Sequence, residues 1–199
     1  HASAVTSVAF SYSSQKLYSA SLDGKIYEWD VASKSSKLLL EHSQGIRALG
    51  TLPNGDVLFL DVKGKLYAQS TSENKKAKML YADLLSDIGT SLTVNNEGNL
   101  VAAGFASGKI VLLNFDEEND AIHYLYGHKG VVKDITFSDD GQFLASVSLD
   151  GKVLLRHLSS LDNKPREMHD DFSFSQSIAF TPNSQYLLVS NQSKLRAYP

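Results

Sequence analysis

A short apolar segment recurs along this sequence at intervals of 41, 42, 44 and 43 residues. Its clearest copies begin at Val5, Val132 and Ser175, and two weaker copies begin at Ile46 and Ile88. Apolar residues in these copies alternate with polar or small ones, which is typical of strands and not of helices. The interval and the alternation together predict a chain of five similar units, each built from short antiparallel strands.

Each copy continues with further strand signals. Second apolar segments occupy residues 17–20, 57–60, 100–103, 143–146 and 186–189, and a third segment follows a Gly-Lys pair in the first four copies. Polar turns join these segments, and a polar loop such as residues 159–166 precedes a fourth apolar segment. The pattern predicts an all-β fold, a β-propeller built of four-stranded antiparallel blades, as a single domain. The blades are expected at residues 1–41, 42–83, 84–126, 127–170 and 171–199.

The fifth copy stops before a fourth strand signal, so its blade is expected to be incomplete. A propeller removes exposed sheet edges by closing on itself. Two arrangements therefore stay open. In the preferred one, the chain is part of a larger propeller, for example of seven blades, whose further blades come from the same or another chain. In the other, the five copies form a ring of their own.

Two copies carry a more specific signature. Copy four has Gly127-His128 before its first strand and Ser148-Leu149-Asp150-Gly151 after its second, and copy one runs from Ser19 to Trp29-Asp30. These motifs resemble the WD40-repeat family, in particular degenerate bacterial members of it. The resemblance implies a buried polar network that joins histidine, serine, aspartate and tryptophan in each blade. The network residues that it implies are His1, Ser19, Asp23 and Trp29 in copy one, and His128, Ser146 and Asp150 in copy four.

The other copies depart from this signature. Arg156 stands at the tryptophan position of copy four, and copy two keeps His42 but has Lys63 at the aspartate position. Most blades are therefore expected to depend on apolar packing between sheets.

The resemblance also implies that partners dock on the face around the central channel. The contact positions flank the first residue of strand one and precede the turn aspartate. Five of them would form an apolar patch, unless they only pack against neighbouring turns: Leu22, Val62, Val131, Leu149 and Phe174.

A basic feature accompanies this patch. Lysine occupies one equivalent position in all five copies, as Lys25, Lys65, Lys109, Lys152 and Lys194. Together with Arg47 and Lys133, these lysines predict a basic crescent that attracts an acidic or phosphorylated peptide. The alternative is that lysine is merely well tolerated after a glycine turn.

No motif for catalysis, for a cofactor or for a metal is recognisable. The sequence has no phosphate loop, nucleophile elbow or metal-ligand spacing, and the acidic run Asp116, Glu117 and Glu118 is typical of a solvated loop. The net charge of −3 argues against a nucleic-acid partner, and no apolar run is long enough for a membrane span. The absence of cysteine favours a cytoplasmic location and leaves a periplasmic one open.

These observations favour a non-catalytic scaffold module that binds a protein or peptide, as part of a larger signalling or assembly protein. One alternative is a ligand-binding or enzymatic propeller with its site in the channel mouth. A third possibility is an architectural segment that completes an assembly through its incomplete blade.

Overall fold

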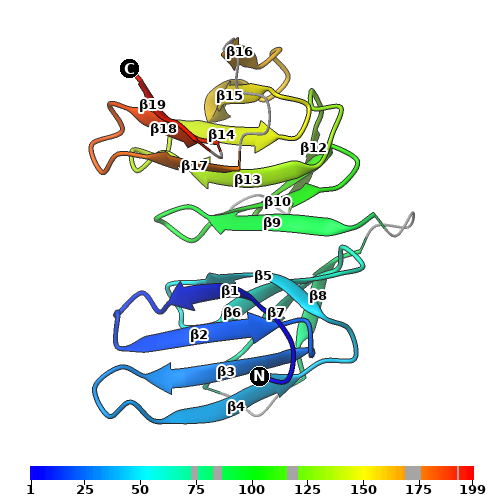
Figure 1. Cartoon of the computed structure of the whole chain (residues 1–199), viewed down its shortest axis with the longest axis vertical. Coiled ribbons are helices and arrows are strands. Elements are labelled where there is room, and N and C mark those ends of the chain that lie inside the picture. Colours follow the sequence, from blue (N-terminus) through cyan, green and yellow to red (C-terminus); the bar gives the residue numbers. More distant parts are fainter. Residues whose placement is uncertain (73–75, 83–86, 116–120, 169–175, 192) are drawn as a thin grey trace. The chain divides into compact units, whose positions relative to one another are not determined.

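Short antiparallel strands recur throughout the part of the chain that the structure describes (Figure 1). The computed structural model describes residues 1–72, 76–82, 87–115, 121–168, 176–191 and 193–199. Within these residues there are nineteen strands in five sheets and one short 3-10 helix. The predicted all-β fold of four-stranded antiparallel sheets is confirmed.

Four of the sheets have four strands each, and the fifth has three among the described residues. The first sheet contains β1 (Val5–Phe10), β2 (Lys16–Ser21), β3 (Lys25–Asp30) and β4 (Ser36–Glu41). The second contains β5 (Ile46–Thr51), β6 (Val57–Asp61), β7 (Leu66–Gln69) and β8 (Lys78–Tyr81). The third contains β9 (Gly89–Val94), β10 (Leu100–Phe105), β11 (Ile110–Asn114) and β12 (Ala121–Leu125). The fourth contains β13 (Val132–Phe137), β14 (Phe143–Ser148), β15 (Val153–His157) and β16 (Arg166–Met168), and the fifth contains β17 (Ser177–Phe180), β18 (Leu187–Ser190) and β19 (Leu195–Tyr198).

The expectation of a plain loop at residues 159–166 is wrong at both ends. The 3-10 helix η1 (Leu158–Ser160) begins directly after β15, and β16 begins at Arg166. The helix starts there because the His157 ring accepts a hydrogen bond from the backbone N–H of Ser159.

The chain divides into two compact units, His1–Leu92 and Thr93–Pro199. In the first unit, the core between the first and second sheets is formed by seven buried residues: Tyr18, Ala20, Ile26, Ile46, Leu49, Val57 and Phe59. In the second unit, one buried cluster joins β10 and β11 to the fourth sheet, and another joins the fourth sheet to the fifth. Within each unit, neighbouring sheets therefore bury apolar side chains against each other, as the alternation requires.

Backbone contacts also join consecutive repeats within each unit. Gly24, in the turn between β2 and β3, accepts a hydrogen bond at its carbonyl from the N–H of His42, which precedes β5, at 2.8 Å. At Gly108, in the turn between β10 and β11, an added Cβ would lie 2.6 Å from the carbonyl oxygen of His128 and 3.1 Å from that of Gly130, both of which precede β13. The segment before the first strand of a repeat thus packs against the turn of the preceding repeat.

Candidate functional site

Three residues expected to flank the first strand lie at β-bulges. The pairing of β1 with β2 shifts register between Val5 and Ser7, so Thr6 is the extra residue. Equivalent shifts make Arg47 the extra residue in β5 and Lys133 the extra residue in β13. A bulge redirects its side chain relative to the regular ladder, and bulges are frequent beside functional sites. The structure thus gives the same special backbone to three of the sequence-predicted positions.

The turn residues are tied to these first strands. The backbone N–H of Leu22 donates to the Ala4 carbonyl at 3.1 Å, and that of Leu149 donates to the Val131 carbonyl at 3.0 Å. The N–H of Val62 donates to the Gly45 carbonyl at 2.9 Å in the same way. The structure therefore brings together the two kinds of position that the sequence predicts as partner contacts.

Exposure separates the members of the predicted apolar patch. Leu22 is 38% exposed and Leu149 is 45% exposed, whereas Val62 and Val131 are half-buried. Phe174 lies outside the described residues. Leu22, Gly45 and Val62 are contiguous in the first unit, because a Cβ on Gly45 would lie 2.9 Å from the Leu22 carbonyl oxygen. We name this group, with Arg47, the first turn surface, and we name Val131, Lys133 and Leu149 the second turn surface.

The predicted lysines contact groups of their own sheets. Lys25 Nζ lies 3.7 Å from a Glu41 carboxylate oxygen, and Lys152 Nζ lies 2.8 Å from one of Glu167. Lys109 Nζ lies 4.7 Å from the centre of the Phe105 ring, a cation–π contact. Lys25 and Lys152 therefore each have a carboxylate that compensates their charge, and Lys109 has an aromatic ring that attracts it, which favours a structural role for all three. Lys133 is exposed.

The four residues of the copy-one network are joined by hydrogen bonds. The Ser19 hydroxyl lies 2.9 Å from His1 Nε2 and accepts a hydrogen bond from Trp29 Nε1 at 2.8 Å. Asp23 lies 3.4 Å from His1 Nδ1 and accepts from the backbone N–H of Lys25 at 2.9 Å. These bonds connect the N-terminal segment, β2, the turn and β3.

Copy four repeats this arrangement with one substitution. His128 lies 2.9 Å from the Ser146 hydroxyl and 3.2 Å from Asp150, which also accepts from the backbone N–H of Lys129. Arg156 is buried at the tryptophan position, and its guanidinium donates to the carbonyl of Tyr126. The histidine, serine and aspartate are thus brought together without the tryptophan.

Copy two contains a polar network that its sequence does not predict, because Lys63 stands at the aspartate position. Asp61, which is fully buried, accepts from the backbone N–H groups of Lys63 and Lys65, both at 2.9 Å, and lies 3.4 Å from His42 Nε2. This blade therefore has a turn carboxylate beside its histidine, although Lys63 stands at the aspartate position. An aspartate two residues before the expected position was the available signal.

Burial controls the protonation of the copy-four network. Desolvation lowers the pKa of His128 below its ordinary value of 6.5, although Asp150 acts in the opposite direction. Burial alone would raise the pKa of Asp150, but N–H donors and His128 outweigh it and hold that pKa below 3.8. His128 is therefore neutral and Asp150 ionised in the folded protein near neutral pH.

A pH dependence of stability follows. Below pH 6.5 the unfolded chain binds a proton at His128 that the folded chain does not, so the free energy of unfolding should fall with pH from that point. The contribution of ionised Asp150 to the free energy of unfolding should be lost only below pH 3.8, as the pH falls through the pKa of Asp150 in the folded chain. Urea unfolding between pH 8 and pH 5 measures the first effect. His128→Gln should flatten this slope, and His157→Gln, at an exposed histidine, is the control; an unchanged slope in His128→Gln would contradict the assignment.

The described part of the chain shows no group of three or more His, Asp or Glu side chains that could hold a metal ion. In the same residues, no helix is long and apolar enough to cross a membrane. The acidic run at residues 116–118 lies outside the described residues. The turn surfaces combine exposed leucines, Leu22 and Leu149, with the cationic residues Arg47 and Lys133, a composition that suits binding of another molecule.

Comparison with known proteins agrees with this geometry. The family model "WD domain, G-beta repeat" matches residues 1–30 and 119–156. The chain is 26% identical over 160 residues to Target of rapamycin complex subunit wat1 of Schizosaccharomyces pombe, with 77% of the chain and 50% of that protein covered. It is 27% identical over 195 residues to Protein HIR1 of Mycosarcoma maydis, with 96% of the chain and 17% of that protein covered. It is 23% identical over 184 residues to mouse Cilia- and flagella-associated protein 57, with 91% of the chain and 14% of that protein covered.

The chain thus spans half or less of the length of these relatives. Among solved structures, the Cps50 (Swd1) β-propeller domain of Myceliophteria thermophila superposes with a TM-score of 0.77 at 15% identity. That match covers 100% of this chain and 70% of the other. The expected likeness to bacterial members stays a prediction. The repeats, the sheets and these matches agree: the chain contains repeats of the WD40 type, which the family model matches over residues 1–30 and 119–156.

Proposed function

We propose that this chain is a non-catalytic protein-interaction module whose turn surfaces bind a peptide or protein partner. The observation that carries the proposal is the equivalent placement of Leu22 and Leu149. Both are exposed leucines in turns that are hydrogen-bonded to the segments leading into bulged first strands. Exposed apolar side chains held by a rigid backbone suit partner binding, because little conformational freedom is lost on association.

Two relatives support a role within an assembly. The fission-yeast wat1 and the LST8 of Saccharomyces cerevisiae are both subunits of a target of rapamycin complex, and this chain is 26% and 25% identical to them. The chain spans 50% and 51% of their lengths. The partner and the larger protein or complex are part of the proposal.

The character of the partner is set by the apolar turn residues more than by the lysines. Lys25 and Lys152 already lie beside Glu41 and Glu167, so a partner would compete with internal acids for them. An acidic or phosphorylated partner stays a prediction. The triple variant Lys25→Gln, Lys109→Gln, Lys152→Gln tests it, since unchanged affinity and salt dependence would rule it out.

Binding should depend on the two leucines. Peptides selected from a random display library on the wild-type chain are expected to lose at least about tenfold in affinity for Leu22→Asp or Leu149→Asp, because a carboxylate would be buried without a partner. Titration calorimetry or fluorescence polarisation measures this change.

Matched controls are available in each unit. Leu38 is 47% exposed and lies on β4, and Tyr186 is 45% exposed and precedes β18. Leu38→Asp and Tyr186→Asp should leave peptide affinity within about twofold. If these controls weaken binding and the turn variants do not, the partner binds elsewhere and the proposed surface is wrong.

A further inference from the structure

A cavity of about 400 Å³ lies within the second unit, between the fourth and fifth sheets. Its apolar lining comes from both sheets: Phe143, Leu155, Met168, Phe180, Leu187 and Tyr198. The volume and the aromatic lining fall in the range of sites for small organic ligands. None of these residues belongs to a turn surface.

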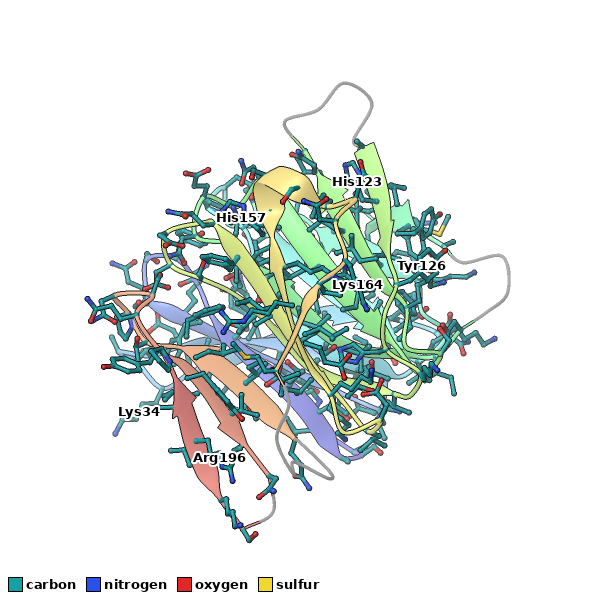
Figure 2. The ribbon with its side chains drawn as sticks, turned by 90° about the horizontal axis from the view of Figure 1, so that it is seen from above. Lys34, His123, Tyr126, His157, Lys164 and Arg196 are labelled. Atoms are coloured by element: carbon teal, nitrogen blue, oxygen red, sulfur yellow. The ribbon has the colours of Figure 1, made fainter. Side chains whose placement is uncertain are left out.

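Local structure explains why the cavity is open. β16 has only three residues, which pair with Val153, Leu154 and Leu155 of β15. Residues 161–165, between η1 and β16, form a loop, and Phe143, Phe180 and Tyr198 are half-buried. Figure 2 shows two other lining residues, His157 near the end of β15 and Lys164 in the loop before β16.

The charges around the cavity are unbalanced. Arg156, Lys164 and Arg166 line it, and among the residues that the structure describes no Asp or Glu side chain does. Lys164 and Arg166 are exposed, and within the described residues no ion pair involves any of the three. Lys152, on the same sheet, contrasts with them because it pairs with Glu167.

Arg156 strengthens this imbalance. It is only 6% exposed, its guanidinium donates to the Tyr126 carbonyl, and its Nε is buried with no hydrogen-bond partner. Burying a cation without a counter-charge is costly, and the pKa of Arg156 is lowered by the same desolvation. An anion at the cavity would offset part of this cost, and guanidinium groups suit carboxylates and sulfonates.

We propose that this cavity binds a small organic anion with an aromatic body. The ring lies among Phe143, Phe180 and Tyr198, and the anionic group faces Lys164 and Arg166. This site is separate from the turn surfaces and does not depend on the proposed function.

The two methionines allow a direct test. The chain has two, of which Met168 lines the cavity and Met79 lies on β8 of the first unit. With 13C-labelled methionine methyl groups, 1-naphthoate should shift the Met168 signal saturably and leave the Met79 signal in place. Met79→Leu assigns the signals. The cation 1-naphthylmethylammonium should bind at least about tenfold more weakly than 1-naphthoate.

Charge-removing variants complete the test. Because Lys164 and Arg166 are exposed, the double variant Lys164→Gln, Arg166→Gln should fold and should lose about tenfold in affinity for 1-naphthoate. Its affinity for neutral 1-naphthol should change by less than about twofold, and Lys133→Gln should leave both affinities unchanged. The proposal is overturned if Met168 shows no saturable shift, if the naphthyl cation binds as well as the anion, or if the double variant keeps its 1-naphthoate affinity.

Discussion

Replacing Gly24 by alanine is expected to lower the free energy of unfolding of the first unit by about 3 kcal/mol. Gly24 has a φ of +79°, which side-chain-bearing residues rarely adopt. A Cβ there would lie 2.3 Å from the carbonyl oxygen of His42 and 3.0 Å from that of Gln44. Both obstacles are backbone atoms of the segment that leads into β5, and the N–H of His42 is bonded to Gly24 itself. The clash can therefore be relieved only by separating two repeats.

Urea unfolding followed by tryptophan fluorescence measures this effect selectively. Trp29, the single tryptophan of the chain, lies on β3 of the first unit and donates to Ser19. Its emission should therefore report unfolding of that unit, and far-ultraviolet circular dichroism reports the chain as a whole.

Gly55 is the matched control. It lies in the same unit with a φ of +89°, but the nearest atom to its Cβ would be the Thr71 hydroxyl at 3.5 Å. Gly55→Ala should therefore incur only the conformational cost, about 1 kcal/mol. Equal losses for the two variants would mean that the approach of His42 to Gly24 does not constrain the fold.

Much of the fold could be predicted from the sequence because strand signals are local. Alternation in segments such as Ser177–Phe180 fixes which side chains face the core, and a glycine before a lysine marks a turn. The bulges at Thr6, Arg47 and Lys133 occur at equivalent positions, so locating one locates the others. Comparing several copies of the repeat therefore predicts more of the turn-surface positions than one copy alone.

The ion pairs and the cavity could not be predicted, because they depend on which strands lie next to each other in three dimensions. Glu41 and Glu167 approach Lys25 and Lys152 from fourth strands. The loops before these strands differ in length between copies, so the sequence interval does not reveal the pairs. The cavity beside Arg156 depends on the short length of β16, and no residue pattern in the sequence predicts that length. The network of copy two could not be predicted by comparing equivalent positions of the repeats. A carboxylate two residues earlier, at Asp61, can accept hydrogen bonds from the same turn N–H groups.

That last case leads to a second large effect. Asp61→Ala is expected to destabilise the first unit by about 3 kcal/mol, because it removes a buried carboxylate and leaves the partly buried backbone N–H groups of Lys63 and Lys65 without their acceptor. Tryptophan fluorescence during urea unfolding again measures the loss. Asp56→Ala, in the turn before β6, should cost less than about 1 kcal/mol.

A repair variant tests the reason for this loss. In copy one, Ser21 accepts from the N–H of Asp23, and Asp23 accepts from that of Lys25. The single carboxylate of Asp61 does both, so Asp61→Ser combined with Lys63→Asp should rebuild the copy-one arrangement and regain most of the lost stability. Recovery no greater than with Asp61→Ser alone would show that the copy-two turn is specific to its own sequence. Full recovery would show that the repeat requires a carboxylate near the turn but accepts it at either of two positions, so that a missing signature aspartate does not by itself identify a weakened blade.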